Sequence, residues 1–332
     1  MTILVTGGAG YIGSHMVHEL ADAGEPVVVL DNLSTGFRFL IPPSVPFVAG
    51  STGDRTVVGE IIARYNITAI IHFAASIVVP ESVADPLSYY GNNTMNTCTL
   101  LDVAVKAGIK HFIFSSTAAV YGETSDAPVR ENAPTAPISP YGTSKLMSEI
   151  MIHDTAKAHG LRFVILRYFN VAGADPKLRT GQATPAATHL IKIACETAIG
   201  KRPKMSVFGT DYPTPDGTCI RDYIHVSDLV QAHSVALNYL RSGGMSATFN
   251  CGYGHGASVL EVIDAVRRAC GRDFPVEISG RRPGDAPALV ANVDRIHATL
   301  PWRPRFQNLD TIVSHALAWE KQLASRRKSA VA

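Results

Sequence analysis

The sequence predicts an α/β fold, in which a doubly wound parallel sheet is joined to a smaller, discontinuous α/β domain. Three observations carry this prediction. Short apolar segments alternate with segments of helical spacing over residues 1–170, as expected for parallel strands covered by helices on both faces. Hydrophobic residues make up 46% of the 332 residues and charged residues only 17%, which suits a sheet buried on both sides. A glycine-rich turn directly follows the first apolar segment.

The expected elements follow one another in strand–helix order. Apolar runs predict strands at 2–7, 27–31, 69–73, 111–116 and 162–170, and helical spacing predicts helices at 11–23, 56–65, 92–107 and 139–159. Gly24, Gly108 and Gly160 directly follow three of these helices. Glycine is common at that place because it adopts the left-handed conformation that ends a helix.

The chain changes character after residue 170. Residues 171–225 are rich in glycine and proline, and residues 272–310 are rich in proline and arginine. Between them, a helix expected at 227–239 and a strand expected at 248–251 would return to the sheet. We therefore expect one domain made of residues 1–170 with about 227–251, and a second made of residues 171–226 and 252–332.

Composition and charge exclude several classes of protein. The 30 Lys and Arg residues against 28 Asp and Glu leave a net charge of +2, whereas nucleic-acid-binding proteins usually carry a larger basic excess or basic clusters. The longest apolar stretch has about 13 residues, and a membrane helix needs about 20. No export signal precedes the first apolar run, and the five cysteines contain no CxxC pair. We expect a cytoplasmic protein that binds neither nucleic acid nor membrane and holds no metal.

The glycine-rich turn at residues 6–13 predicts a dinucleotide site. Gly7, Gly10 and Gly13 lie between the first predicted strand and helix, where such glycines permit a tight turn, a close approach to a pyrophosphate and close helix–strand packing. The helix N-terminus adds free N–H groups and partial positive charge. Asp31 ends the second predicted strand about 20 residues later, where an acid meets the ribose 2′-hydroxyl and would repel a 2′-phosphate. NAD is therefore favoured over NADP.

A Tyr-x-x-x-Lys pair predicts the base of a hydride-transfer reaction. Tyr141 and Lys145 lie near the start of a predicted helix, and their spacing puts both on one helix face. The neighbouring ammonium should lower the pKa of Tyr141, so that its phenolate takes a proton from a sugar hydroxyl as hydride leaves the carbon. Thr117 follows the strand expected at 111–116, at the edge where parallel sheets bind ligands. Its hydroxyl is expected to bridge Tyr141 and the substrate.

Several motifs, taken together, match one enzyme family. TGGAGYIGSH, DNLS, HFAAS, the Asn92–Asn93 pair, FSSTAAVYG, YGTSK and RYFNVAGAD occur in the order seen in the extended short-chain dehydrogenase/reductases. GTCIRDYIHVSDL at 217–229 and RRPGD at 281–285 narrow the resemblance to the UDP-galactose (UDP-glucose) 4-epimerases. The resemblance covers nearly the whole chain, and RDYIHV and the RYFN–AGA run are its most specific parts.

The resemblance implies a Rossmann domain that binds NAD, a UDP-sugar-binding domain, and a reaction through a 4-keto sugar. Tyr141 would be the base, Lys145 would tune it and bind the nicotinamide ribose, and Thr117 would touch the sugar. The residues implied to bind NAD are Gly7, Gly10, Tyr11, Ile12, Gly13, Asp31, Asn32, Ser51, Phe73, Ala74, Asn92, Ser115, Tyr141, Lys145 and Phe169. Those implied to hold the UDP-sugar are Thr117, Asn170, His189, Leu190, Ser206, Phe208, Arg221, Tyr223, Arg282, Asp285 and Leu289.

The resemblance also implies a homodimer and a cytoplasmic isomerase. Family members commonly pair through helices of the NAD-binding domain, here residues 92–107 and 141–159, in a four-helix contact. Arg221 and Arg282 suit the diphosphate of the substrate, because a guanidinium binds phosphate oxygens in a bidentate way.

Three positions depart from the common pattern of the family. Ser51 stands where many members have an acid that holds the adenine, and Asp54 could replace it only if the loop shifts its register. Ile77 stands where many have a lysine near the cofactor phosphates, so NAD could be held less tightly. Leu289 stands where a bulky tyrosine is linked with rejecting N-acetyl sugars, so some activity on UDP-GlcNAc and UDP-GalNAc is expected.

Three other functions are alternatives to a 4-epimerase. Nucleotide-sugar dehydratases and decarboxylases need an acid or base beside the threonine, whereas Ala118 and Ala119 occupy those positions and cannot transfer protons. A module that senses NAD without chemistry would not need both Tyr141 and Lys145. A UDP-pentose or UDP-uronate 4-epimerase on the same fold stays open, because only the pocket around C6 would differ.

Overall fold

The computed structural model describes residues 1–123, 128–185, 187–282 and 284–329. Its central sheet has seven strands in the order β11–β6–β5–β4–β1–β2–β3, and every neighbouring pair is parallel. The predicted doubly wound sheet is therefore confirmed. The strands are β1 (Thr2–Thr6), β2 (Val27–Asp31), β3 (Phe47–Ala49), β4 (Ile67–His72), β5 (His111–Thr117), β6 (Arg162–Tyr168) and β11 (Ala247–Cys251).

Helices cover both faces of this sheet. Alternate residues of β1 enter different cores: Ile3 and Val5 pack in one, and Leu4 packs in the other, as the two-residue period of a strand requires. The first core takes in side chains of α1 (Tyr11–Asp22) and α8 (Val226–Arg241). The second takes in side chains of α2 (Arg55–Tyr65), α5 (Asn96–Lys106) and α6 (Pro140–His159).

The boundaries of α6 follow from local chemistry. Ser139 is its N-cap and accepts a hydrogen bond from the amide of Gly142 at 3.2 Å, and Pro140 takes the first helical position, where its missing N–H costs nothing. Gly160 ends the helix with φ of +67°. The sequence prediction for this helix is therefore confirmed. Because α6 starts at Pro140, Tyr141 lies in its first turn.

The structure corrects two predicted elements. The helix expected at 92–107 begins instead with a π-helical turn, η2 (Tyr90–Met95), and only then becomes α5. The amide side chain of Asn93 binds the backbone of Ser76 and the hydroxyl of Ser144, and π turns often accompany such specific placements. The strand expected at 162–170 ends at Tyr168, and Asn170 starts another strand because its amide donates to the carbonyl of Asp222.

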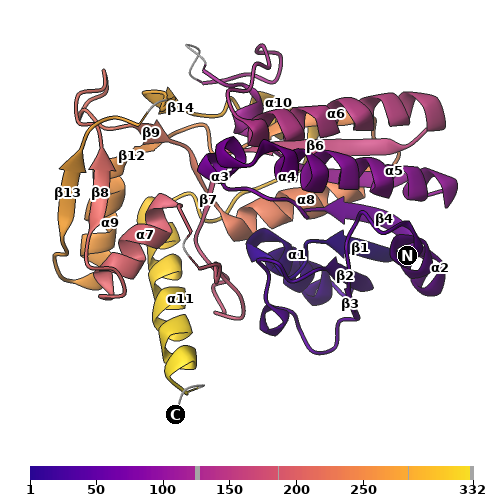
Figure 1. The fold of residues 1–332 in the computed structure, drawn as a ribbon, viewed down its shortest axis with the longest axis horizontal. Coiled ribbons are helices and arrows are strands. Elements are labelled where there is room, and N and C mark those ends of the chain that lie inside the picture. The colour runs from indigo at the N-terminus through magenta and orange to yellow at the C-terminus, as the bar shows by residue number, and fades with distance from the viewer. Residues whose placement is uncertain (124–127, 186, 283, 330–332) are drawn as a thin grey trace.

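A smaller lobe, on the left in Figure 1, is built from residues of the second half of the chain. The glycine- and proline-rich residues 171–225 and the proline- and arginine-rich residues 272–310 contain helices and strands that periodicity did not predict. The remaining elements are η1 (Arg38–Leu40), α3 (Val79–Ala84), α4 (Pro86–Tyr89), η3 (Ala118–Val120), β7 (Asn170–Ala172), α7 (Leu190–Ala198), β8 (Met205–Phe208), β9 (Ile220–Arg221), β10 (Tyr223–His225), β12 (Ala257–Ser258), α9 (Val259–Cys270), β13 (Val276–Ser279), β14 (Ala288–Leu289), α10 (Asp294–Thr299) and α11 (Leu309–Ser329).

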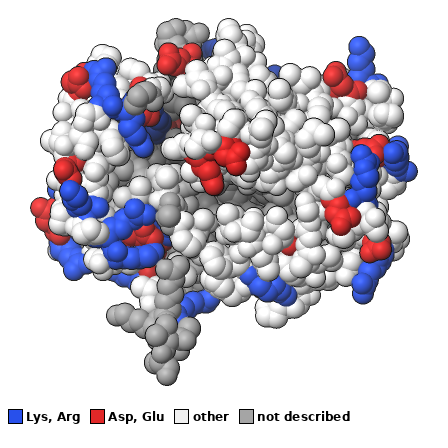
Figure 2. Space-filling view, in the orientation of Figure 1, with Lys and Arg blue, Asp and Glu red and all other residues white. Residues whose placement is uncertain are grey.

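Figure 2 shows that charged side chains gather over this lobe and at the opposite end of the molecule, and are sparse between them. Within the described residues, no helix combines the length and the apolar character needed to cross a membrane.

A buried ion pair joins α6 to the middle of the sheet. The guanidinium of Arg167 on β6 contacts the carboxylate of Glu149 on α6, with Nη2 at 2.6 Å from Oε2 and Nε at 3.0 Å from Oε1. Ser116 on β5 donates to the same carboxylate. Both charged side chains are less than 10% exposed, so neither charge can be left without its partner at low cost.

We predict that Arg167→Met lowers the free energy of unfolding by about 3–5 kcal/mol, because it leaves the Glu149 carboxylate buried and unpaired. Chemical denaturation of both proteins measures the change. Arg268→Met, which breaks the exposed pair with Asp310, is the matched control and should cost about 0–1 kcal/mol. Equal losses in the two variants would contradict the role given to the buried pair.

Candidate active site

The glycine turn after β1 is packed too closely for side chains at two of its three glycines. A Cβ on Gly7, which has φ of +69°, would lie 2.5 Å from the amide nitrogen of Ala74. A Cβ on Gly13 would lie 2.1 Å from the carbonyl oxygen of Gly7. The turn, the start of α1 and the end of β4 therefore touch backbone to backbone, as a dinucleotide-binding turn requires.

Gly10 differs from the other two because a side chain there would meet a single atom, at a tight distance that a small shift of the backbone can relieve. A Cβ there would meet only the carbonyl oxygen of Gly7, at 3.3 Å. Gly10 is the N-cap of α1 and has no side chain to cap it, so the first amide N–H groups of α1, including those of Tyr11 and Ile12, are free of helical partners. This open, positively polarised helix end fits the pyrophosphate of NAD.

Asp31 lies at the end of β2 beside this turn. Its Oδ2 accepts a hydrogen bond from the amide of Ala9 at 2.9 Å, and its Oδ1 accepts one from the amide of Leu33 at 2.8 Å. Burial raises the pKa of Asp31 and these two bonds lower it. The carboxylate is thus held in one orientation, while its other lone pairs stay free for a ribose hydroxyl. Asn32 follows it in the exposed loop.

The predicted adenine-side residues line up beyond β3 and β4. Ser51 uses its hydroxyl to accept from the amide of Gly53 at 3.1 Å. Asp54 is the N-cap of α2, and its Oδ1 accepts from the amides of Thr56 and Val57. Ile77 is 51% exposed. The weaker hold on NAD that these departures imply stays a prediction.

Asn92, on the π-helical turn, faces the same loop as Ile77. Its amide nitrogen donates to Ser76 Oγ at 2.9 Å, and its amide oxygen accepts from Asn96 at 3.1 Å. The amide of Phe73 donates to the carbonyl of Thr6 at 3.0 Å, so Phe73 and Ala74 continue directly from the strand end over the glycine turn. The structure therefore brings these predicted NAD residues to one edge of the sheet.

The predicted catalytic residues meet where β5 ends. Thr117 is the last residue of β5, and its hydroxyl lies close enough to the phenol of Tyr141, in the first turn of α6, to lower the pKa of that phenol. The same hydroxyl oxygen accepts from the amide of Ala119 at 3.1 Å. Lys145 lies one helical turn after Tyr141, and its ammonium donates to the carbonyl oxygen of Ser115 at 2.9 Å. Tyr141 and Thr117 are each 8% exposed.

Burial opposes the lowering of the Tyr141 pKa that the neighbouring lysine is expected to cause. Burial raises the pKa of Tyr141, and the hydrogen bond with Thr117 only partly offsets that effect. Burial also lowers the pKa of Lys145 to about 8, against the attraction of Glu149. The physical reason is the same for both side chains, since removal from water disfavours the charged form of each.

Ser115 is buried beneath this group and not open to a ligand. Its hydroxyl lies 3.0 Å from Nε2 of His233, and its carbonyl oxygen is the acceptor for Lys145. Ser115 therefore acts on the site through Lys145. The buried His72 has both ring nitrogens hydrogen-bonded, to Thr6 and Thr97.

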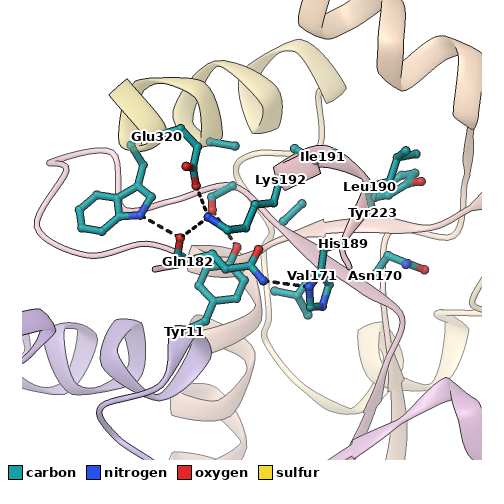
Figure 3. A pocket seen from close by; sticks show the side chains of 14 residues that line it. Tyr11, Asn170, Val171, Gln182, His189, Leu190, Ile191, Lys192, Tyr223 and Glu320 are labelled. Carbon is teal, nitrogen blue, oxygen red and sulfur yellow. Dashed lines mark hydrogen bonds and ion pairs between the residues drawn. The ribbon is translucent and has the colours of Figure 1, made fainter. Parts of the chain in front are cut away.

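One pocket collects five of the predicted residues from distant parts of the chain. Tyr11, Asn170, His189, Leu190 and Tyr223 all line it, from α1, β7, α7 and β10 (Figure 3). The hydroxyl of Tyr11 donates to the carbonyl of Gly173 at 2.7 Å, which joins the glycine-turn helix to the segment that leads into the smaller lobe.

The two predicted diphosphate arginines converge on Asp285. Arg221 Nη2 lies 3.3 Å from Oδ1 of Asp285, and Arg282 Nε lies 3.1 Å from Oδ2. The guanidinium of Arg282 also covers the ring of Phe208, 4.4 Å from its centre. Arg221 is further fixed by the carbonyl of Ala286 at 2.8 Å. The two arginines therefore form one cluster around Asp285, and their binding of a diphosphate stays a prediction; Pro283 of the same motif lies outside the described residues.

The remaining predicted residues border these clusters. Leu289, on β14 next to Arg221 in the sheet register, packs with Phe169 against the turn that follows Thr117. Ser206 lies on β8, two residues before Phe208. Leu289 is only partly buried. Its register beside Arg221 and its packing near Thr117 place it between the end of β5 and the arginine cluster.

Sequence reasoning missed the buried residues that support the site. Asp222 is fully buried and accepts hydrogen bonds from the amides of Tyr253, Gly254 and Ala291. Gln182, Lys192 and the C-terminal residues Trp319 and Glu320 line the pocket of Figure 3. Only Asp222 had a signal, since it lies inside the RDYIHV motif. Within the described residues, no three His, Cys, Asp or Glu side chains are placed to hold a metal ion.

Comparison with known proteins places this geometry among nucleotide-sugar enzymes. Residues 3–252 match the family model described as the NAD dependent epimerase/dehydratase family. A UDP-glucose 4-epimerase of Azospirillum brasilense is 58% identical over 97% of this chain and 92% of its own. The UDP-glucose 4-epimerase of Brucella ovis in complex with NAD superposes with a TM-score of 0.93 at 44% identity, over 96% of this chain and 97% of its own. The UDP-Glc/GlcNAc 4-epimerase of Campylobacter jejuni has a TM-score of 0.86 at 47% identity, over 97% of this chain and 99% of its own.

We predict that Gly10→Ala and Gly13→Ala separate cofactor binding from folding. Gly10→Ala adds a methyl group whose one close neighbour is the carbonyl oxygen of Gly7 at 3.3 Å, so stability should change by less than about 1 kcal/mol, while NAD affinity falls at least tenfold because the methyl group obstructs the pyrophosphate. Gly13→Ala forces backbone atoms apart and should cost about 3 kcal/mol or more. Calorimetric titration with NAD and denaturation of the cofactor-free protein measure both effects. Unchanged NAD affinity in Gly10→Ala would contradict the assignment.

Proposed function

The chain belongs to the NAD dependent epimerase/dehydratase family, and from this premise we propose how its own residues carry out the reaction. It is an NAD-dependent 4-epimerase that interconverts UDP-glucose and UDP-galactose. The observation that carries the mechanism is the placement of Tyr141, in the first turn of α6, beside Thr117 at the end of β5, with Lys145 one helical turn further on and bonded to the carbonyl of Ser115. The relatives make the UDP-pentose or UDP-uronate alternative unnecessary.

Tyr141 is the base, and Thr117 connects it to the sugar. When bound, NAD would supply the hydride acceptor for C4 of the sugar and then the hydride donor to its opposite face. Tyr141 accepts the proton of the O4 hydroxyl and gives it back, and Thr117 relays the hydrogen bond between the two oxygens. The nearby charge of Lys145 stabilises the phenolate. Burial of Tyr141 and Thr117 keeps bulk water away from the exchanged proton.

The arginine cluster holds the substrate while the sugar turns. Arg221 and Arg282 bind the diphosphate, and Asp285 keeps both guanidinium groups at one place. With the diphosphate fixed, the 4-keto sugar rotates about its own link to it and presents the other face of C4. In this scheme residues 1–170 with 227–251 hold NAD, and residues 171–226 and 252–332 hold the UDP-sugar; residues 330–332 lie outside the described part.

We further propose that the enzyme works as a cytoplasmic homodimer. Exposed apolar side chains gather on α3, α4, η2 and α6: Val83, Leu87, Met95, Met147 and Ile150 are each more than 40% exposed. Few charged side chains lie over this part of the face in Figure 2. Such a patch marks an interface more often than a free surface. Light scattering of the purified protein gives its mass, and a monomer at micromolar concentration would rule the dimer out.

We predict that Tyr141→Phe lowers kcat for UDP-galactose by about 10²–10⁴-fold, because it removes the proton acceptor and keeps the packing of the ring. Conversion to UDP-glucose, followed by product analysis, measures the rate. Tyr239→Phe, which removes a phenol near the C-terminal end of α8, is the control and should stay within about twofold. A loss below about fivefold in Tyr141→Phe would remove Tyr141 from its role.

We predict turnover of UDP-GlcNAc and UDP-GalNAc by the wild-type protein, since Leu289 leaves space beside the sugar. Leu289→Tyr should lower kcat/KM for these sugars at least tenfold relative to UDP-galactose, because the larger ring takes the space of the acetamido group. Leu289→Met, which keeps the volume, is the control. Undetectable turnover of both acetamido sugars by an active wild-type preparation would refute this prediction.

A further inference from the structure

Gln182 lies in the pocket of Figure 3 next to His189, a residue proposed above to hold the UDP-sugar. It is buried in the segment between β7 and α7. Its side-chain nitrogen Nε2 lies 2.8 Å from Nδ1 of His189. An amide nitrogen can only donate, so Nδ1 must accept, and the single proton of a neutral imidazole then belongs to Nε2.

The Nε2 atom of His189 is left for a ligand. Among the residues that the structure describes, it has no hydrogen-bond partner, and the ring lines the same pocket as Asn170 and Tyr223. Burial and the charge of Lys192 both lower the pKa of His189. The ring is therefore neutral near pH 7, and its tautomer decides whether Nε2 donates or accepts.

Gln182 is itself held in place by two helices. The backbone carbonyl oxygen of Gln182 accepts from Nζ of Lys192 on α7 at 2.9 Å and from Nε1 of Trp319 on α11 at 3.2 Å. The ammonium of Lys192 is buried and paired with the carboxylate of Glu320. A Cβ on the preceding Gly181 would lie 2.5 Å from the indole of Trp319, so the backbone has little freedom to move at this point.

We propose that Gln182 is a positioning residue, which holds His189 as its Nε2–H tautomer so that the ring donates a hydrogen bond to an acceptor oxygen of the bound nucleotide sugar. Lys192 and Trp319 fix Gln182, and through it the C-terminal helix α11 supports the substrate site. This inference rests on the proposed function, because it takes a UDP-sugar as the ligand.

A double-mutant cycle on UDP binding tests the proposal. Gln182→Ala and His189→Ala should each weaken UDP binding by about 5- to 10-fold, as expected for the loss of one hydrogen bond. The double variant should bind no more weakly than His189→Ala, because both changes remove the same donor. Gln322→Ala, an amide on α11 outside the pocket, is the matched control and should leave the Kd for UDP unchanged. Isothermal titration calorimetry measures all four.

The tautomer gives a second readout that a purely structural role would not change. Nitrogen-15 spectra of histidine-labelled wild-type protein should show Nε2–H at His189. Gln182→Glu, whose carboxylate accepts, should move the proton to Nδ1 and weaken UDP binding. Because the tautomer is read in the wild-type protein, the test stands even if Gln182→Ala does not fold.

Two results would overturn the inference: an Nδ1–H tautomer in the wild-type protein, or independent, multiplying losses of UDP affinity in the double variant. A wild-type protein that neither binds UDP nor converts UDP-galactose would instead overturn the proposed function. The two failures are therefore distinguishable.

Discussion

The hydrogen bond from the ammonium of Lys145 to the carbonyl of Ser115 ties helix α6 to the end of strand β5, and the active site depends on it. Because Tyr141 lies one helical turn before Lys145, this bond also places the phenol against Thr117, where β5 ends. A buried ammonium is costly, and the carboxylate of Glu149 offsets part of that cost. Glu149 is in turn paired with Arg167 on the neighbouring strand, so the sheet, the helix and the site are held by one chain of charges.

A second group of paired charges, more exposed than the first, lies in the smaller lobe. A net charge of +2 over the whole chain hides the arrangement in which Arg221 and Arg282 meet on Asp285. Asp222, next to Arg221 in the chain, takes three backbone amides and fixes the strand that carries this arginine. The positive charge therefore stands at one place on a rigid support, which suits a substrate whose diphosphate must stay still while its sugar turns.

Patterns that depend on neighbouring residues were predictable from the sequence. The sheet, the glycine turn and the ends of α6 follow from apolar runs, glycines and a serine–proline cap. The π-helical turn at 90–95 was not, because it follows from contacts of Asn93 with Ser76 and Ser144, far away in the chain. For the same reason Gln182 and Lys192 carried no signal: their partners lie on α7 and α11. The burial that raises the pKa of Tyr141 was not predictable either, because the spacing of the Tyr–Lys pair shows the lysine but not the loss of water around the phenol.

The proposed mechanism depends on the proton state of Tyr141. Burial raises the pKa of this phenol, whereas proton transfer from the sugar needs the phenolate. Titration of the phenolate absorbance, as the difference between wild type and Tyr141→Phe, measures that pKa directly in the cofactor-free protein and in the protein loaded with NAD. The account predicts that the pKa lies above the ordinary phenol value without cofactor and below it with NAD bound, and that Lys145→Met abolishes most of the drop. An equally high pKa in both states would contradict Tyr141 as the base.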